Sequence, residues 1–130
     1  MIPKFRAWDK RENTMRDVAV LHFTKGGKVN SIEYWKTPSE LKSYHVRNLV
    51  LMQSTGLKDK NGVEIFEGDL VEHDDNINGT WETFEACEIV YDGDYAQFCF
   101  KNDASNFLSY YRNLCIIGNI HENPELLEDK

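Results

Sequence analysis

The sequence predicts a mainly β protein with a few short helices, built as a single small barrel-like domain of short antiparallel strands. Two observations lead to this prediction. Segments of strand length recur along the whole chain, and turn signals containing glycine or asparagine separate them. The length of 130 residues suits one domain over residues 1–130, and a chain of this size can bury a core without disulfides or metals.

The first third of the chain predicts three strands. "KFRAW" (4–8) alternates basic and apolar side chains before a polar turn. "DVAVLHF" (17–23) and "VNSIEYW" (29–35) are rich in β-forming residues. They flank "KGGK" (25–28), which indicates a hairpin turn because glycine adopts positive φ at little steric cost.

"TPSEL" (37–41) predicts a short helix after these strands. Thr37 can cap the helix, proline suits its first position, and Glu40 can reach back as in a capping box. We expect such a helix to carry Leu41 and Tyr44 inward.

The rest of the chain predicts further strands joined by tight turns. "NLVLMQ" (48–53) is an apolar run typical of a central, covered strand. "DKNG" (59–62) and "EGD" (67–69) are turn signals, and "DDNINGTWETF" (74–84) is expected to be an exposed loop. The other strands expected are 63–66, 70–73, 85–92, 95–101 and 114–120, and helical turns are expected at 103–111 and 124–130.

Charge is distributed unevenly along the sequence. Residues 1–60 hold 12 Lys and Arg against 6 Asp and Glu, a net charge of +6, and residues 61–130 hold 3 against 16, a net charge of −13. The asymmetry can mark separate interaction surfaces. In the other interpretation, early and late strands interleave in one barrel, so that the charges mix in space.

Cysteine use and hydropathy predict a cytoplasmic protein that does not contact membranes. Cys87, Cys99 and Cys115 are odd in number and lack the close pairing of zinc ligands, which predicts buried, reduced thiols. No run reaches the roughly 18 apolar residues of a membrane span. The first residues lack an apolar signal core.

Three stretches carry a resemblance to a known family. "KFRAWD" near the start, "TGLKDKNGVEIFEGDLV" in the middle and "IIGNIHENPELLE" near the end resemble the YopX family of small proteins, encoded mainly by bacteriophages, prophages and plasmids of bacteria. The resemblance spans Phe5 to Glu128. It implies a mostly β, barrel-like fold that tends to associate with itself, and it assigns no activity and no site residues.

The central turns offer a candidate binding rim, which consists of Lys58, Asp59, Glu67, Asp69 and His121. Loops on a rigid scaffold often bind ligands, and two adjacent turns could present these charges together. In the structural interpretation, the glycines set the turn geometry while the aspartates accept hydrogen bonds from nearby backbone amides. The pattern favours the structural interpretation.

The N-terminal segment offers a candidate basic and aromatic patch, which consists of Lys4, Arg6, Trp8, Lys10 and Arg11. Small barrels bind single-stranded nucleic acid with such patches. An isoelectric point near 5.0 and a net charge of −7 oppose an extended contact with phosphates, so nucleic acid is not the favoured partner.

The residues that could support catalysis are scattered. The four histidines lack metalloenzyme spacing, and "DGD" (92–94) lacks the pattern of a calcium loop. His121 beside Glu122 could act as an acid or base, but no nucleophile accompanies it. We therefore predict no catalytic residue, metal or cofactor, and an acid–base or metal-dependent enzyme is the weakest alternative.

The sequence predicts a phage-type or prophage-type accessory protein that binds macromolecules, is not an enzyme and forms homo-oligomers. Its partners would be copies of itself, or a protein of the phage or of the bacterial host. The main alternative is a nucleic-acid-binding regulator that uses the basic N-terminal segment.

Overall fold

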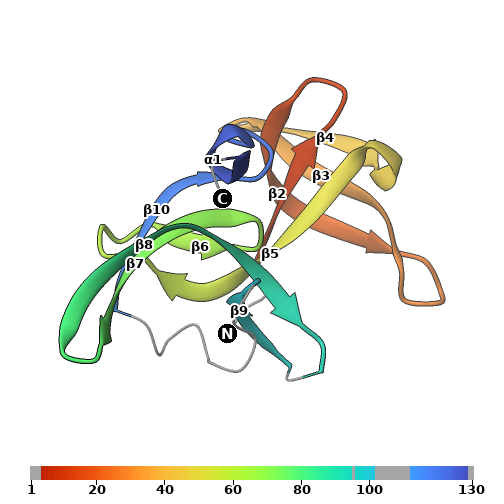
Figure 1. Ribbon diagram of the computed structural model, residues 1–130. Coiled ribbons are helices and arrows are strands. Elements are labelled where there is room, and N and C mark those ends of the chain that lie inside the picture. Colours follow the sequence, from red (N-terminus) through yellow and green to blue (C-terminus); the bar gives the residue numbers. More distant parts are fainter. Residues whose placement is uncertain (1–3, 95, 102–111, 129–130) are drawn as a thin grey trace. The chain divides into compact units, whose positions relative to one another are not determined.

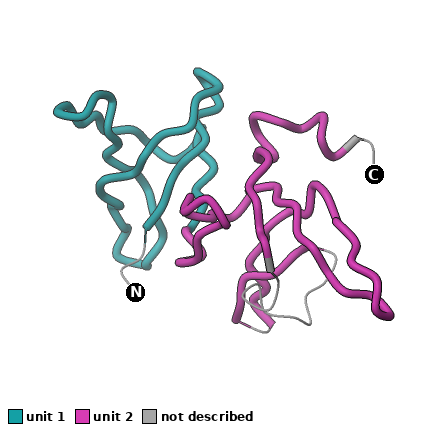
Figure 2. Tube along the Cα trace, turned by 90° about the vertical axis from the view of Figure 1, so that its left-hand side faces the viewer, with its two compact units in different colours: residues 1–53 teal, residues 54–130 magenta. Residues whose placement is uncertain are grey.

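The computed structural model describes residues 4–94, 96–101 and 112–128, which form antiparallel strands and two short helical segments (Figure 1). Contacts between residues divide the chain into two compact units, residues 1–53 and 54–130 (Figure 2). We call them unit 1 and unit 2. Among the described residues, no helix has the length and apolar character needed to cross a membrane.

Unit 1 contains four complete strands and the start of a fifth, hydrogen-bonded in the order β4-β3-β2-β1-β5. Its Ala7, Ile32, Tyr34 and Leu49 form a buried core. A 3₁₀ turn, η1 (Val46–Asn48), leads into β5. The strands are β1 (Phe5–Asp9), β2 (Thr14–Phe23), β3 (Val29–Thr37), β4 (Glu40–His45) and β5 (Leu49–Lys58).

Unit 2 contains a four-stranded sheet in the order β10-β7-β8-β9, and its β6 pairs with the second half of β5. A buried core of Ile65, Val71, Ile89, Phe100 and Leu114 holds these strands together. The elements are β6 (Glu64–Phe66), β7 (Asp69–Ile77), β8 (Thr80–Asp92), β9 (Gln97–Phe100), β10 (Arg112–Asn119) and the single helical turn α1 (Glu125–Glu128).

The predicted fold class is confirmed, because the described residues are mainly β and every strand pair is antiparallel. The strands form two open sheets and not a closed barrel in the part of the chain described. The cysteines are free, with Cys99 buried and Cys87 and Cys115 half-buried.

The interpretation in which early and late strands interleave in one barrel is wrong. Among the described residues, strands β1 to β4 pair with each other and with the first half of β5, β6 pairs with the second half of β5, and β7 to β10 pair with each other. The basic and acidic parts of the sequence therefore fold into different units.

The helix expected at residues 37–41 is also wrong. Pro38 and Ser39 form a turn, and Leu41 and Tyr44 lie on β4, paired with Trp35 and Ile32 of β3. Leu41 is exposed, and not inward as expected. Capping signals only start a helix, and an isolated short helix is marginal in water, so strand pairing prevails.

The loop expected at residues 74–84 is a hairpin instead. Strands β7 and β8 (green in Figure 1) pair up to Ile77 and Thr80, and Asn78 and Gly79 form the turn with φ of 52° and 85°. Positive φ at both central residues is the geometry for which Asn-Gly is favoured. The helix expected at 103–111 lies outside the described residues.

Candidate functional site

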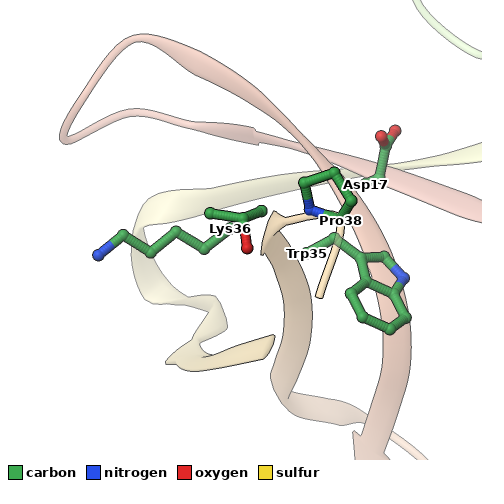
Figure 3. A pocket seen from close by; sticks show the side chains of 5 residues that line it. Asp17, Trp35, Lys36 and Pro38 are labelled. Atoms are coloured by element: carbon green, nitrogen blue, oxygen red, sulfur yellow. The ribbon is translucent and has the colours of Figure 1, made fainter. Parts of the chain in front are cut away.

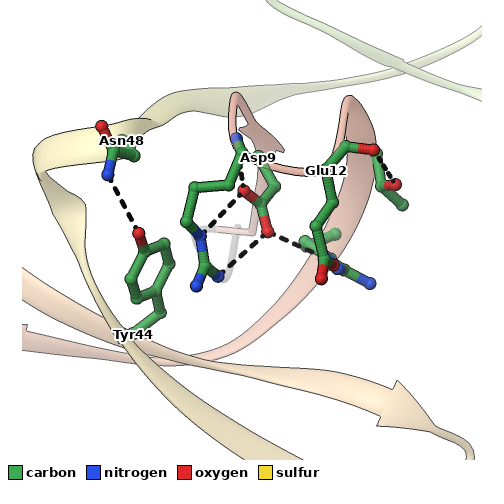
Figure 4. A network of polar contacts seen from close by, with 7 residues as sticks. Asp9, Glu12, Tyr44 and Asn48 are labelled. Carbon is green, nitrogen blue, oxygen red and sulfur yellow. Dashed lines mark hydrogen bonds and ion pairs between the residues drawn. The ribbon is translucent and has the colours of Figure 1, made fainter.

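The predicted basic patch includes a network around Asp9, at the end of β1 in unit 1 (Figure 4). The Asp9 carboxylate is fully buried and accepts hydrogen bonds from the Arg11 backbone amide (3.0 Å) and guanidinium (3.2 Å). Arg16 donates to the same carboxylate from Nε at 3.4 Å, and Glu12 pairs with the far side of Arg16. The hairpin between β1 and β2 brings these residues together.

Two tyrosines support the arginines of this network. The guanidinium carbon of Arg11 lies 3.2 Å from the centre of the Tyr44 ring, and that of Arg16 lies 4.8 Å from the centre of the Tyr34 ring. Such cation–π contacts are attractive. The Asn48 amide donates to the Tyr44 hydroxyl at 3.0 Å, which fixes the ring (Figure 4).

Opposing effects within this network determine the pKa of Asp9. Burial alone would raise the pKa of Asp9, but the hydrogen bonds and charge of Arg11, together with a hydrogen bond from Arg16, outweigh burial and lower the pKa below its ordinary value of 3.8. Asp9 is thus a carboxylate at neutral pH, and it neutralises much of the positive charge of its partners.

The five residues of the predicted patch have different surroundings. Lys4 and Lys10 are exposed, and Arg6 is half-buried. Trp8 is only 9% exposed, so its ring is not a platform on which a base could stack. Arg11 is engaged by Asp9 and Tyr44. A nucleic-acid site here stays a prediction.

A shallow pocket of about 410 Å³ lies on unit 1 at the end of β3 (Figure 3). Asp17, Trp35, Lys36, Thr37 and Pro38 line it, and all five are exposed. The pairing of β3 with β4 has a register shift between Trp35 and Thr37. The Lys36 side chain extends away from Trp35 and Asp17 in Figure 3. The pocket therefore offers an indole face, a carboxylate and a lysine beside it.

The predicted binding rim lies in unit 2, where Lys58 is exposed at the end of β5. Asp59 is buried, and its carboxylate accepts from the backbone amides of Asn61 and Val63 (2.9 Å each) and Ile116 (3.1 Å). Burial would raise the pKa of Asp59, but these hydrogen bonds lower it below 3.8. Asp59 therefore fixes a turn and joins it to β10.

The other rim residues lie at two further turns. Asp69 is buried, and its carboxylate accepts from the Phe66 amide at 2.8 Å across the β6–β7 turn. Glu67 and His121 are half-buried. The His121 backbone amide donates to Asn119 Oδ1 at 3.0 Å, in the turn after β10. A ligand site at this rim stays a prediction, and Asp59 and Asp69 have backbone partners that account for their positions.

The end of the β7–β8 hairpin, residues 75–85, forms an arm of unit 2. Residues 76–85 are all exposed, and Trp81 has 63% of its surface accessible. At its base, Asp74 accepts from the Thr83 hydroxyl (2.7 Å) and the Asn113 amide (3.2 Å), which lowers the pKa of Asp74. Among the residues described, no three His, Cys, Asp or Glu side chains are placed to hold a metal ion.

Sequence reasoning missed the exposed Trp35 and placed Trp81 in a loop. The signal for Trp81 was present, because Asn78-Gly79 between alternating residues indicates a hairpin, as the same dipeptide does at Asn61-Gly62. No local signal distinguishes an exposed tryptophan of a strand from a buried one. That difference depends on which face of the strand is covered.

A family model described as "YopX protein" matches residues 4–128. The chain belongs to the YopX family. A search among curated proteins gives no match. Among solved structures, the chain is similar to the crystal structure of protein EF1440 from Enterococcus faecalis, with 36% identity, a TM-score of 0.68, and coverage of 98% of this chain and 99% of that one.

The crystal structure of protein yopX from Bacillus subtilis also shares the fold. It is 20% identical and has a TM-score of 0.58, and the match covers 95% of this chain and 96% of that one. The three stretches that carry the YopX resemblance hold Asp9, Asp59, Asp69 and Asn119, whose side chains bond to nearby backbone amides. In this protein, those stretches stabilise turns.

Proposed function

We propose that this YopX-family protein is a non-enzymatic module that binds macromolecules and associates with copies of itself. One observation carries the proposal. Unit 1 holds ten Lys and Arg against five Asp and Glu, a net charge of +5, whereas unit 2 holds five against 17, a net charge of −12. Oppositely charged units favour association of unit 1 of one copy with unit 2 of another.

The stretch from residue 61 to residue 100 strengthens the proposal. It holds 11 Asp and Glu and no Lys or Arg, and it includes β6, β7, β8 and β9. The stretch therefore has a large net negative charge of its own, and Lys101, just beyond it, lies 3.9 Å from the Glu88 carboxylate. A head-to-tail contact with a basic unit would balance this negative charge.

The biological setting that we propose follows from the family. YopX-type proteins are associated with phages and prophages, so we place the protein in the cytoplasm of a bacterial host as an accessory protein. A protein of the phage or host with a basic surface would be a second partner for unit 2.

Light scattering after gel filtration tests the self-association. At low salt the protein should elute as an oligomer, and at about 1 M salt, where the screening length is about 3 Å, the oligomer should dissociate. The double variant Lys25→Glu, Lys28→Glu at the exposed β2–β3 turn should weaken the oligomer, and Lys25→Arg, Lys28→Arg should not. A monomer at every salt concentration contradicts the proposal.

A second candidate function is nucleic-acid binding by unit 1, which its net charge of +5 favours. The engagement of Arg11 and Arg16 with Asp9 opposes it. If it is correct, Lys10→Glu should weaken binding of a labelled oligonucleotide, and Lys101→Glu in unit 2 should not. Equal binding by both variants would remove the N-terminal segment from the site.

A further inference from the structure

We propose that Trp81, on the β7–β8 arm of one copy, docks into the pocket beside Trp35 on unit 1 of a second copy. This inference rests on the self-association proposed above and names its contact. It joins the exposed tryptophan of the acidic unit to the pocket of the basic unit.

The arm presents Trp81 in a defined position. The Asn78-Gly79 turn fixes the register of the hairpin, in which Trp81 pairs with Asn76 and Thr80 pairs with Ile77. Trp81 is 63% exposed and Ile77 is 41% exposed, so neither side chain is buried in the core of its own unit. A large aromatic side chain on a rigid hairpin loses little entropy on binding, and tryptophan is among the residues that dominate interface energies.

The arm also carries an electrostatic mismatch that a basic partner would relieve. Asp75 of β7 lies directly opposite Glu82 of β8. Like charges in this position of an antiparallel pair repel each other. Because residues 61–100 contain no Lys or Arg, no cation on the arm can offset the repulsion. A partner lysine or arginine placed against the arm would do so.

The pocket on unit 1 has the groups that an indole requires. Val18 pairs with Tyr34, so one step along the two strands Asp17 lies beside Trp35. The Trp35 ring, 45% exposed, and the Pro38 ring both line the pocket and offer apolar contacts (Figure 3). The Asp17 carboxylate can accept a hydrogen bond from the indole N–H of the incoming Trp81, whose ring needs such a partner when buried.

Size and charge agree with this occupant. A pocket of about 410 Å³ lies within the range that holds small organic ligands, and an indole side chain is smaller than most of these. The Lys36 side chain extends outward, away from Trp35 and Asp17 (Figure 3). Its partner in its own chain, Glu40, is 4.0 Å away and exposed, so Lys36 can reach a carboxylate of the arm.

The contact is head-to-tail, because the arm and the pocket belong to different units. Each added copy leaves one arm and one pocket free, so the contact closes into a ring or extends, according to the rotation between copies. This property gives the inference a strict test.

The test compares four full-length proteins by sedimentation velocity at low salt. Trp81→Ala and Trp35→Ala should each weaken self-association about tenfold or more, since each removes one side of the contact. Tyr91→Ala, which removes an exposed aromatic of β8 outside the arm, should assemble like the unchanged protein. Circular dichroism and thermal unfolding confirm that each variant is folded.

Mixing the two variants then tests the pairing itself. Trp35→Ala keeps an intact arm and Trp81→Ala keeps an intact pocket, so an equimolar mixture should form a one-to-one complex that neither forms alone. A mixture that stays monomeric would overturn the inference, as would unimpaired assembly of Trp81→Ala. The variants Lys36→Glu and Glu82→Lys give a second test that leaves both tryptophans in place. Each variant alone should fail to assemble, and an equimolar mixture of the two should assemble again.

The outcomes separate this inference from the function on which it rests. If the unchanged protein is monomeric at every salt concentration, the self-association fails, and the contact fails with it. If the unchanged protein assembles and Trp81→Ala assembles equally well, self-association stands and only the docking of Trp81 is wrong. A Trp81-dependent contact within a single chain would appear as a concentration-independent, salt-sensitive change in sedimentation coefficient, and it would also overturn the inference.

Discussion

Each unit buries an aspartate, but the two units supply its hydrogen-bond donors from different sources. In unit 1, Asp9 is held by the side chains of Arg11 and Arg16, together with one backbone amide. In unit 2, Asp59 is held by three backbone amides. The acidic unit has few cations to offer, and its main-chain donors, together with the charge of Lys60, lower the pKa of this buried carboxylate.

The two arrangements also differ in rigidity. The amides that bind Asp59 belong to the turn after β5 and to β10, so they are fixed by the strands themselves. Arg11, by contrast, is 41% exposed on a flexible side chain. We therefore expect Asp59 to contribute more to stability than Asp9, and its contribution to be less sensitive to salt.

The largest effect is expected from Asp59→Ala. The substitution leaves three backbone amides without their acceptor, and we expect a loss of about 3 kcal/mol in the free energy of unfolding. Urea denaturation followed by circular dichroism measures it. Asp94→Ala, at an exposed carboxylate, is the control and should change stability little. Equal stability of the two variants would show that Asp59 is not a structural anchor.

A smaller loss is expected from Asp9→Asn. The amide can still accept a hydrogen bond, but the arginines lose their counter-charge, and we expect a loss of about 2 kcal/mol. The loss should shrink as salt is added. Glu12→Gln, at the exposed partner of Arg16, should cost little. A loss for Asp9→Asn larger than that for Asp59→Ala would reverse the comparison.

Acid should reduce stability through both aspartates, by less than either substitution does. The folded-state pKa of Asp9 and of Asp59 lies below 3.8, so their stabilisation is complete above that pH and is lost as the pH falls through the folded pKa. A protonated carboxyl group keeps an acceptor oxygen, which limits the loss. Urea midpoints measured between neutral pH and about pH 2 should show that the difference between the unchanged protein and each variant becomes smaller, without vanishing.

The smallest effect is expected from Gly118→Ala. This substitution tests a third place where a side-chain oxygen accepts a hydrogen bond from a backbone amide. A Cβ at position 118 would lie 2.5 Å from Asn123 Oδ1, the atom that accepts from the Asn119 amide at 3.2 Å. Asn123 must move aside, and we expect a loss of about 1 kcal/mol. Gly93→Ala, where a Cβ meets nothing within 4 Å, is the control. Thermal unfolding of the two variants provides the comparison.

The turns and most strands could be predicted from the sequence because turn chemistry is local. Asn61-Gly62 and the glycine at 68 mark turns that the structure contains, and the aspartates beside them accept backbone amides as expected. The same signal at Asn78-Gly79 is sufficient to predict the hairpin, but the whole stretch 74–84 was expected to be an exposed loop. The loop prediction was therefore a wrong interpretation of a signal that the sequence contains.

The segment at 37–41 and the Asp9 network could not be predicted in the same way. Local capping signals at Thr37 favour a helix start, and only pairing with β3 makes the following residues a strand. The engagement of Arg16 by Asp9 depends on the register of β1 and β2, which no short window reveals. The charge of a segment therefore did not show how much of that charge remains available on the folded surface.

The cation-free stretch of unit 2 determines how the protein can be probed. Trypsin cuts after lysine and arginine, so it has no site between Lys60 and Lys101. Four of the ten described strands therefore remain within one tryptic peptide whether or not they are folded. Amine-reactive cross-linkers find no lysine there either. Carboxyl-directed coupling and a glutamate-specific protease are the reagents that can report on this part of the molecule.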